Sequence, residues 1–343
     1  MAGSSADGIT LGLIRFCYLS DRWHYELLEG STIPYPNSLR EVLLKARDLS
    51  AADILELSIS YTDWTAQKVR ETFFHKAYDI VAWHPHTVFH RPDKGLTWSL
   101  GDAERLRVQV GHPVVTHFRA RDIAAGGVGA PLIPFPDALL FSSYEALINL
   151  GGIANLTYLP RPTGYDICPC NQLLDALAQQ ADPNLLYDPE GTLAQTGDLI
   201  PSLASYFESQ PFLHLPPPKA LDNQSAQQHF IQPFLSYHAH PKDKLHTAVH
   251  VIASTLIKEL KRVQARSFTL TGGGTYNTFL VATLQEKAKE EDIQYKPAPS
   301  TLVAYREVIG FGLIGLLRWL GLPNTSKMWT GARSGHSSGT LSL

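Results

Sequence analysis

Gly151 and Gly152 lie near the start of residues 146–175, the segment whose residue types and spacing say most about chemistry. Apolar runs on either side of this glycine pair predict two strands, Ala146–Leu150 and Ile153–Tyr158, that form a hairpin. Because the turn has no side chains, its backbone N–H groups are exposed and can bind an anion. The hairpin therefore predicts a turn that handles phosphate.

Asp166 follows this hairpin after a short link and precedes an amphipathic helix predicted for residues 171–180, which Pro169 opens. A carboxylate at this place commonly caps the helix and interacts with its dipole. It acts instead as a general base when it lies in a cleft, within hydrogen-bond reach of a hydroxyl or a water molecule. The residues alone leave both roles open.

Two glycine-rich segments have the composition of nucleotide-binding loops. Gly3-Ser4-Ser5-Ala6-Asp7-Gly8 combines two hydroxyls and a carboxylate, which suits a phosphate tail with its Mg²⁺ and makes Asp7 the candidate metal ligand. It is not a P-loop, because no Gly-Lys-Ser/Thr ends it. Gly272-Gly273-Gly274 follows an apolar strand and precedes a helix containing Asn277, so a flat ring can lie against its backbone.

His84, His86 and Thr87 form a polar cluster after a short buried strand. The two histidines point to the same face if the backbone is extended, but a third metal ligand is not evident nearby. The default interpretation is that they are surface loop histidines.

Arg119 and Asp122 precede a second glycine-rich stretch, residues 126–131. Such a pair can grip hydroxyls or a carboxylate through charge-assisted hydrogen bonds, and a structural ion pair is an equal alternative. Glu307 lies in a predicted helix that is otherwise mostly apolar. It is therefore either paired with an arginine or directed into a cleft.

Composition limits the class of protein. With 343 residues the chain is expected to form two domains, and 44% hydrophobic and 18% charged residues permit a substantial core. A net charge of −3 gives no reason to expect nucleic acid or anionic lipid as a partner. No uninterrupted apolar run reaches the length of a membrane span, and no signal peptide is visible. Three cysteines without framework spacing indicate a reducing compartment.

Strands and helices alternate along the chain, which predicts an α/β fold. Further strands are expected at residues 9–18, 25–28, 78–83, 114–117, 267–271 and 293–295. Helices are expected at residues 38–47, 51–75 with a break near Tyr61, 102–110, 197–210, 223–238, 245–265, 277–290 and 303–320. Residues 216–219, Pro-Pro-Pro-Lys, predict a stiff surface segment, and the Ser- and Gly-rich tail from Thr325 is expected to pack loosely.

Taken in order, these motifs resemble the anhydro-N-acetylmuramic acid kinase family of the sugar kinase, Hsp70 and actin fold group. Residues 3–8 resemble its phosphate loop, 84–87 its Ser-His-Gly-Gln-Thr, 118–131 its Phe-Arg-x-x-Asp and Gly-Gly-x-Gly-Ala-Pro stretch, 149–155 its Asn-Leu-Gly-Gly-Ile-Ala-Asn, 165–171 its Phe-Asp-Thr-Gly-Pro-Gly-Asn, 215–219 its Pro-Pro-Lys and 271–277 its adenosine loop. The chain departs from the pattern at Pro85 and His86, which replace glycine and glutamine, and at Cys168 and Cys170, which replace small residues.

The resemblance implies two ribonuclease-H-like domains, of the actin and hexokinase type, around a central cleft. The N-terminal domain would comprise residues 1–136 with part of residues 321–343, and the C-terminal domain residues 137–320. The strand that precedes the phosphate loop in the family has no counterpart here, so the first sheet is expected to lack one strand.

The resemblance also implies the substrates and their ligands. ATP and Mg²⁺ would bind three loops, which comprise Gly3, Ser4, Ser5, Ala6, Asp7 and Gly8, then Gly151, Gly152 and Asn155, and finally Gly272, Gly273, Gly274 and Asn277. The anhydro sugar would contact His84, His86, Thr87, Arg119, Asp122 and Glu307. Family members act in the cytoplasm, in the recycling of peptidoglycan fragments, and tend to be homodimers.

Asp166 would be the catalytic residue. It would take a proton from a water molecule that attacks C1 of 1,6-anhydro-N-acetylmuramic acid, and O6 would accept the γ-phosphoryl group of ATP to give N-acetylmuramic acid 6-phosphate. Two alternatives stay open: a kinase of another anhydro sugar, such as levoglucosan, and a non-catalytic protein that binds sugar or nucleotide.

Overall fold

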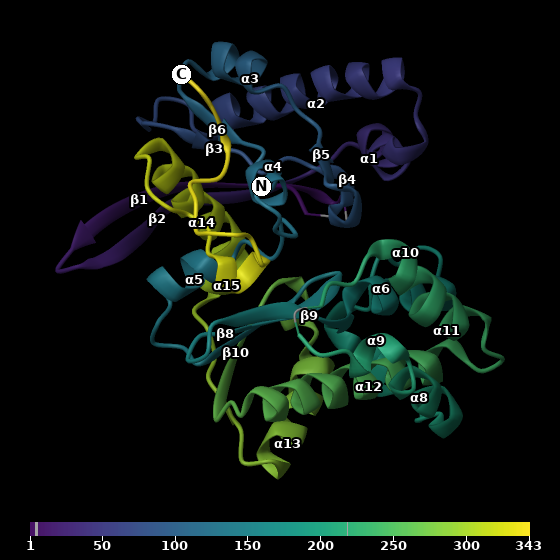
Figure 1. Cartoon of the computed structure of the whole chain (residues 1–343). Helices are drawn as coiled ribbons and strands as arrows, with labels where there is room; N and C mark the ends of the chain where they lie inside the picture. Colours follow the sequence, from purple (N-terminus) through teal and green to yellow (C-terminus); the bar gives the residue numbers. More distant parts are fainter. Residues whose placement is uncertain (4–5, 218) are drawn as a thin grey trace. The chain divides into compact units, whose positions relative to one another are not determined.

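The chain forms two compact units in a computed structural model that describes residues 1–3, 6–217 and 219–343. Unit 1 comprises Met1–Phe141 and Tyr305–Leu343, and unit 2 comprises Ser142–Ala304. Each unit combines sheets with helices, so the α/β class expected from the sequence is confirmed (Figure 1). The two units are described separately.

Unit 2 is built on a five-stranded sheet with the strand order β11-β10-β7-β8-β9. Its strands are β7 (Ala146–Leu150), β8 (Ile153–Tyr158), β9 (Thr163–Pro169), β10 (Ser267–Thr271) and β11 (Gln294–Tyr295). β7, β8 and β9 form an antiparallel meander, whereas β10 runs parallel to both β7 and β11. The predicted glycine hairpin is confirmed, because β7 and β8 pair directly across Gly151 and Gly152.

The helices of unit 2 pack around α12 (Pro241–Val263), whose buried face includes Leu245, Ile252 and Leu256. The other helical segments are α6 (Asn171–Ala181), η3 (Pro189–Gly191), α7 (Thr192–Gln195), α8 (Pro201–Glu208), α9 (Pro211–His214), α10 (Asn223–Ala226), the π-helical η4 (Gln227–Ile231), α11 (Gln232–Ser236), η5 (Gly273–Tyr276) and α13 (Thr278–Glu290). α12 contacts α6, α7, α8, α13 and β9. It is therefore the central helix of the core of unit 2.

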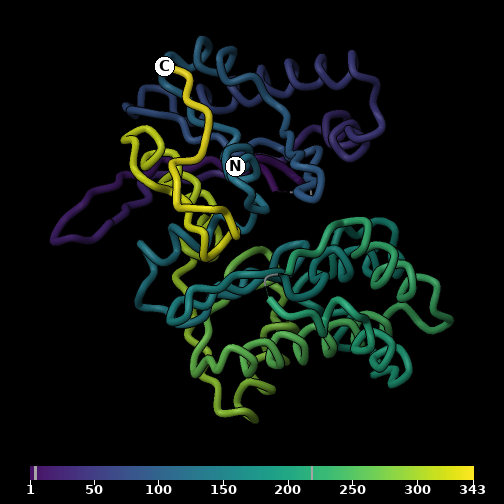
Figure 2. Tube along the Cα trace, in the orientation of Figure 1, coloured from purple at the N-terminus to yellow at the C-terminus, as the bar shows by residue number. Residues whose placement is uncertain are grey.

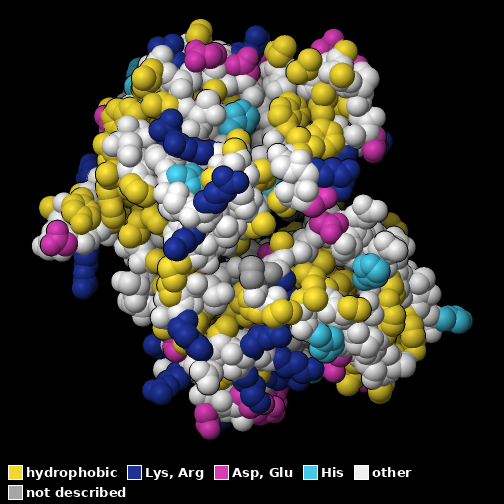
Figure 3. Space-filling model, viewed as in Figure 1, with side chains coloured by type: hydrophobic (Ala, Val, Ile, Leu, Met, Phe, Trp, Pro, Cys, Tyr) yellow, Lys and Arg dark blue, Asp and Glu magenta, His cyan; other side chains and the backbone are white. Residues whose placement is uncertain are grey.

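The described strands of unit 1 form three small sheets, with the orders β1-β2, β12-β6-β3 and β4-β5. They are β1 (Gly8–Leu19), β2 (Arg22–Pro34), β3 (Val81–Ala82), β4 (Thr87–Arg91), β5 (Leu96–Ser99), β6 (Val114–Thr116) and β12 (Thr340–Ser342). The long β1–β2 hairpin projects from the unit, and hydrophobic and charged side chains are mixed on its outer part (Figure 3). Tyr18 and Leu19 are among its exposed apolar residues.

The first residues of unit 1 link two of its segments. Ala2 forms an isolated bridge with Ile9 and donates its N–H to the carbonyl oxygen of His84 at 2.9 Å. These contacts connect the start of the chain to β1 and to the segment that carries the predicted histidine cluster.

Helix α2 (Ala51–Thr72) runs unbroken through Tyr61, so the predicted break there is wrong. Its N-cap is Ser50, whose hydroxyl accepts the N–H of Asp53 at 3.2 Å, and the helix begins at the predicted residue, Ala51. Tyr61 is wholly buried, and its burial against the core keeps α2 continuous.

The remaining helical segments are α1 (Asn37–Leu44), η1 (Ala46–Asp48), η2 (Pro92–Lys94), α3 (Ala103–Val110), α4 (Ala120–Ala124), α5 (Pro134–Leu140), α14 (Ser300–Trp319) and α15 (Lys327–Thr330).

Helix α14 begins in unit 2 and continues into unit 1. Among the described residues it is the one helix whose length and hydropathy would permit a membrane span. Within its most apolar window, 56% is buried inside the protein. This burial is what a core helix requires.

The C-terminal tail, residues 324–342, is packed rather than loose, so the expectation from its Ser- and Gly-rich composition is wrong. β12 pairs with β6, and Trp329 and Asn324 are buried. Asn324 Nδ2 donates to the carbonyl oxygens of Ile314 and Ser338 at 2.9 and 2.8 Å. Figure 2 shows this tail (yellow) returning to the region where the C-terminus lies beside α3 and β6 in Figure 1. Side-chain hydrogen bonds, strand pairing and a few buried apolar side chains together hold this segment in place.

A buried ion pair in unit 1 yields the first prediction. Arg306 Nε donates to Asp137 Oδ1 at 3.1 Å, and the two side chains are 3% and 0% exposed. Replacing Arg306 with Met leaves a buried carboxylate without its main cation, which should lower the free energy of unfolding by about 3–5 kcal/mol. Urea unfolding followed by circular dichroism measures this loss.

The control is Arg15→Met, which breaks the exposed Arg15–Glu26 pair. Exposed pairs contribute at most about 1 kcal/mol, so this variant should stay close to the wild type. Equal losses in the two variants would contradict the prediction.

Candidate functional site

Asp166 lies within strand β9, whereas the sequence predicted that it lies in a link before the helix. The residue at the N-cap of α6 is Cys170, and the first N–H groups of the helix bond to the carbonyl oxygens of Gly151 and Gly152. The Asp166 carboxylate instead accepts the N–H of Leu221 at 2.9 Å through Oδ2. The helix-cap interpretation of Asp166 is therefore wrong.

A row of polar residues crosses the meander at this position. Asn149 on β7 pairs with Asn155 on β8, and Asn155 pairs with Asp166 on β9. Directly paired residues point to the same face of a sheet, and all three are partly exposed. A register shift between Ala154 and Asn155 precedes the pair that contains Asp166. The sheet thus places the Asp166 carboxylate in one row with the side-chain amides of Asn155, on the neighbouring strand, and Asn149, on the strand after it. This row lies close to the turn at Gly151 and Gly152.

Two asparagines explain why the loops around this row need glycine. A Cβ on Gly272 would lie 2.5 Å from Asn149 Oδ1, and one on Gly274 would lie 2.8 Å from Asn171 Oδ1. Gly272 also has a φ of +85°, which disfavours any other residue. Asn149 and Asn171 thus belong to the candidate site, although the sequence analysis placed them only within motifs and did not assign them a role. Their position directly beside glycine turns is the signal that could have revealed them.

Gly273 and Asn277 complete the second glycine loop. A Cβ on Gly273 would have only Asn171 Nδ2 nearby, at 3.8 Å, so the backbone there is open to a flat ligand. Asn277 is the N-cap of α13, and its Oδ1 accepts the N–H of Leu280 at 2.9 Å. Asn277 therefore fixes where the helix begins after the loop.

Lys219 anchors the segment that holds Asp166. Asp166 N–H donates to the carbonyl oxygen of Lys219 at 3.1 Å, and Lys219 Nζ lies 3.0 Å from Glu259 Oε1. The two side chains are 2% and 6% exposed, so the expected surface position of Lys219 is wrong. Tyr165 adds a donor to Glu259 at 2.9 Å, and burial, reinforced by the Glu259 charge, raises the pKa of its hydroxyl. The buried Glu259 carboxylate thus fixes Tyr165, which precedes Asp166 on β9, and Lys219, whose carbonyl oxygen accepts the Asp166 N–H.

Cys168 and Cys170 belong to the apolar core of unit 2. Burial raises the pKa of the Cys168 thiol well above its usual range and that of Cys170 to about 12. Thiols protonated in this way are poor nucleophiles, so the two residues serve as packing beside the site.

The N-terminal loop is described in part, because Ser4 and Ser5 lie outside the described residues. Ala6 is buried with a φ of +53°, and Asp7 is exposed, with one carboxylate oxygen 3.4 Å from Arg40 Nη2. Gly3 precedes Ser4, and Gly8 begins β1, where a Cβ would collide with the carbonyl oxygen of Ile33. The described residues contain no group of three or more metal-ligand side chains.

His84 is buried and contacts Arg119, so the surface-loop interpretation of the histidines is wrong. His84 Nε2 lies 3.1 Å from Arg119 Nη2, and its Nδ1 lies 3.0 Å from the carbonyl oxygen of Pro85. A guanidinium only donates and a carbonyl only accepts, so the ring is neutral with its proton on Nδ1. Burial, together with the Arg119 charge, lowers the pKa of His84 well below 6.5, which agrees with this state.

The other residues expected to contact the sugar lie in the same unit. His86 is buried, and Thr87 Oγ1 lies 3.0 Å from Ser99 Oγ. Burial raises the pKa of Glu307, and the charges of Arg306 and Arg119 partly oppose this shift. His84, Arg119 and Glu307 therefore share one electrostatic environment.

Asp122 differs from these residues because its carboxylate is wholly buried. It accepts the N–H of Gly129 at 2.8 Å and the hydroxyl of Thr330 at 2.7 Å. These bonds give Asp122 a structural role, although neither of them is the ion pair that the sequence left open as the alternative.

Comparison with known proteins covers the whole chain. The family model described as anhydro-N-acetylmuramic acid kinase matches residues 1–342. A relative named anhydro-N-acetylmuramic acid kinase from Parasynechococcus marenigrum is 31% identical over 97% of this chain and 95% of its own length. A relative of the same name from Xanthomonas campestris is 32% identical over 97% of this chain and 93% of its own length.

Among solved structures, a ROK family glucokinase from Streptomyces griseus overlaps with a TM-score of 0.41 and 11% identity, covering 85% of this chain and 92% of that chain. A ROK hexokinase from Thermus thermophilus overlaps with a TM-score of 0.34 and 12% identity, covering 90% of this chain and 100% of that chain. Overlaps of this size support no functional statement.

Buried histidines in unit 1 predict a pH dependence of stability. Burial lowers the pKa of His84, His86, His90 and His117, that of His90 to about 4. Between about pH 4 and pH 6.5 the unfolded chain binds protons that the folded chain does not, so stability should rise with pH in this window and level off above it. Thermal unfolding between pH 4.5 and 7.5 measures this trend.

His90→Gln should make the slope shallower, because it removes one of these groups. His238→Gln, at an exposed position, is the matched control and should leave the slope unchanged. A slope that His90→Gln does not alter would contradict the prediction.

Proposed function

The chain belongs to the anhydro-N-acetylmuramic acid kinase family, and we propose that it opens 1,6-anhydro-N-acetylmuramic acid with water and phosphorylates its O6 with ATP. The match of the family over residues 1–342 is the observation that carries the proposal. The product is N-acetylmuramic acid 6-phosphate, which assigns the enzyme to the recycling of cell-wall fragments.

Asp166 is the proposed base. Its carboxylate is partly exposed, and the Leu221 N–H fixes its orientation, which a base needs to meet a water molecule in one geometry. Asp166 takes a proton from this water, whose oxygen forms a bond to C1 as the bond between C1 and O6 breaks. O6 bonds to the γ-phosphorus of ATP, and ADP leaves. Three bonds therefore break: the water O–H bond, the bond between C1 and O6, and the bond between the γ-phosphorus and ADP. Three bonds form: from the proton to Asp166, from the water oxygen to C1, and from O6 to the γ-phosphorus.

The nucleotide is proposed to bind the three glycine-rich loops. Two features support close approach of the nucleotide to the backbone. They are the open space at Gly273 and the turn at Gly151 and Gly152, with Asn155 beside it. Asp7 presents an exposed carboxylate, the ligand type that Mg²⁺ prefers, and would hold this ion at the N-terminal loop. When bound there, Mg²⁺ neutralises charge on the transferred phosphoryl group.

The sugar is proposed to bind His84, Arg119 and Glu307. The guanidinium of Arg119 donates strong hydrogen bonds, and the neutral His84 ring keeps it oriented without adding a second positive charge. The family resemblance also assigns His86, Thr87 and Asp122 to the sugar site, because they belong to the same sequence motifs as His84 and Arg119. We also propose that the enzyme is a cytoplasmic homodimer whose two domains correspond to the two units described above, in place of the boundaries 1–136 and 137–320 expected from the resemblance.

An ADP-release assay tests the proposed activity. Purified protein with MgATP should release ADP and form a sugar phosphate with 1,6-anhydro-N-acetylmuramic acid, and far less with levoglucosan or other anhydro sugars that lack the lactyl and N-acetyl groups. Absence of both products with every sugar in the panel would overturn the proposal.

Asp166→Asn should lower turnover at least ~100-fold, the usual contribution of a general base, while nucleotide affinity stays near that of the wild type. Asparagine keeps an oxygen that can accept the Leu221 N–H, so the fold is retained. Steady-state kinetics and nucleotide calorimetry measure the two effects. Asp198→Asn, at an exposed position of the same unit, is the control. Near-normal turnover in Asp166→Asn would show that another group is the base.

A further inference from the structure

Asp122 is a buried anion at the centre of a loop that also carries Arg119. We call residues 118–131 the arginine loop. Asp122 Oδ2 accepts the N–H of Gly129, so the carboxylate bridges two parts of this loop. A wholly buried carboxylate needs several donors to offset its lost hydration. The loop's own N–H group supplies one donor, and the others come from elsewhere in unit 1.

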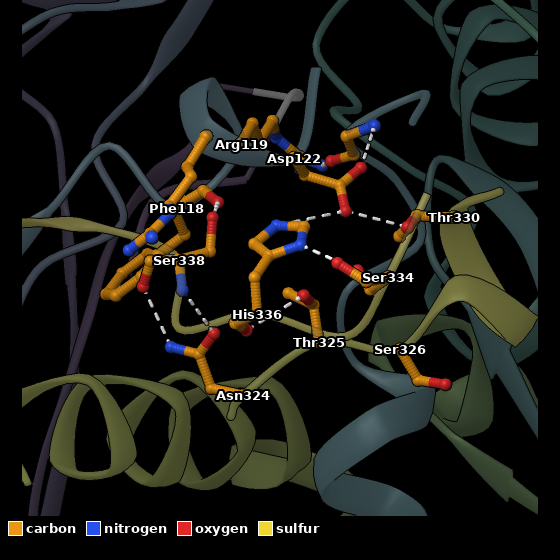
Figure 4. Close-up of polar contacts among 12 residues, drawn as sticks. Phe118, Arg119, Asp122, Asn324, Thr325, Ser326, Thr330, Ser334, His336 and Ser338 are labelled. Carbon is orange, nitrogen blue, oxygen red and sulfur yellow. Dashed lines mark hydrogen bonds and ion pairs between the residues drawn. The ribbon is translucent and has the colours of Figure 1, made fainter. Parts of the chain in front are cut away.

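The C-terminal tail supplies a donor from its Thr330 side chain. Thr330 Oγ1 donates to Asp122 Oδ1 at 2.7 Å, and His336 Nε2 lies 3.5 Å from the same oxygen. Figure 4 shows both side chains pointing from the tail toward Asp122. Two tail residues thus meet one oxygen of a carboxylate about two hundred positions earlier in the chain.

The tail also bonds to the backbone of the arginine loop near both of its ends. Ser338 Oγ donates to the carbonyl oxygen of Phe118 at 2.5 Å, and Val128 N–H donates to the carbonyl oxygen of Thr330 at 2.9 Å. Asn324 braces the tail itself by accepting the N–H of Ser338 at 2.6 Å (Figure 4). The loop is therefore held at its start, at Asp122 and before Gly129.

Gly129 transmits this restraint to Arg119. Its N–H donates to Asp122, while its carbonyl oxygen accepts Arg119 Nη1 at 2.7 Å. Arg119 Nη2 in turn contacts His84 Nε2 at 3.1 Å. The position of the guanidinium thus depends on where Asp122 holds Gly129, and the position of Asp122 depends on its hydrogen bond from Thr330.

We propose that the C-terminal tail positions Arg119 for the anhydro sugar through Asp122 and the arginine loop, with Thr330 and Ser338 as positioning residues. The inference rests on the proposed function, in which Arg119 contacts the sugar. Loss of a tail donor leaves the buried carboxylate short of a partner, so Asp122 and Gly129 shift and the guanidinium loses its orientation. A tail that merely completed the fold would affect stability but not selectively affect sugar binding.

Thr330→Val in the full chain tests this coupling, because it removes the hydroxyl and keeps the shape. We expect the KM for the anhydro sugar to rise about tenfold, with kcat and the KM for ATP within about twofold of the wild type. Amide hydrogen exchange, measured by mass spectrometry, should increase in peptides covering residues 118–131. Thr330→Ser restores the hydroxyl and should reverse both effects.

Thr340→Val is the matched control, the same substitution at an exposed position of the same tail. It should change neither exchange in the arginine loop nor the KM for the sugar. Ser338→Ala, which removes the hydroxyl that donates to the Phe118 carbonyl oxygen, provides a second test with effects in the same direction and carries the experiment if Thr330→Val does not fold.

Unchanged exchange in the tail variants, or raised exchange without a change in KM, would overturn the positioning role. A wild type that does not turn over the sugar would overturn the proposed function, and the substrate part of this inference with it. The exchange measurement then still decides whether the tail restrains the loop.

Discussion

Burial of carboxylates away from water is the constraint on which the arrangement of unit 1 depends. An ionised carboxylate in a protein interior costs several kcal/mol unless donors replace its hydration. Asp137 and Asp122 are both wholly buried. Their principal side-chain donors, Arg306 and Thr330, lie 169 and 208 positions further along the chain. Folding of the unit therefore has to bring the C-terminal helix and tail back onto the N-terminal segments before either carboxylate is satisfied.

The same constraint operates in unit 2, one residue away from the proposed base. Glu259 on the central helix accepts from Tyr165 on β9 and pairs with Lys219, whose carbonyl oxygen accepts the N–H of Asp166. A buried pair of this kind adds little net stability, because desolvation offsets most of its attraction. Its consequence here is geometric, since it fixes the strand and the facing segment between which the Asp166 carboxylate lies.

Local patterns made part of this structure predictable. The glycine pair specified the β7–β8 hairpin, and Ser50 specified the start of α2, because both signals act over a few residues. The position of Asp166 within β9 was not predictable in this way. The stretch around it is short and contains Gly164 and Pro169, which are typical of turns, and pairing with β8 decides its conformation. The packed tail was missed for a related reason: its serines, threonines and asparagine have partners far away in the sequence.

Motif resemblance assigned both Asp166 and Asp122 to the site, and burial separates them. A base has to exchange protons with water, which a partly exposed carboxylate whose orientation a backbone N–H helps to fix can do. A carboxylate that accepts a backbone N–H and a hydroxyl in the interior has no such access to water. Asp122 is thus suited to hold Gly129 in place and Asp166 to move a proton. Two residues of one type, both in recognisable motifs, acquire different duties from their different exposure to water.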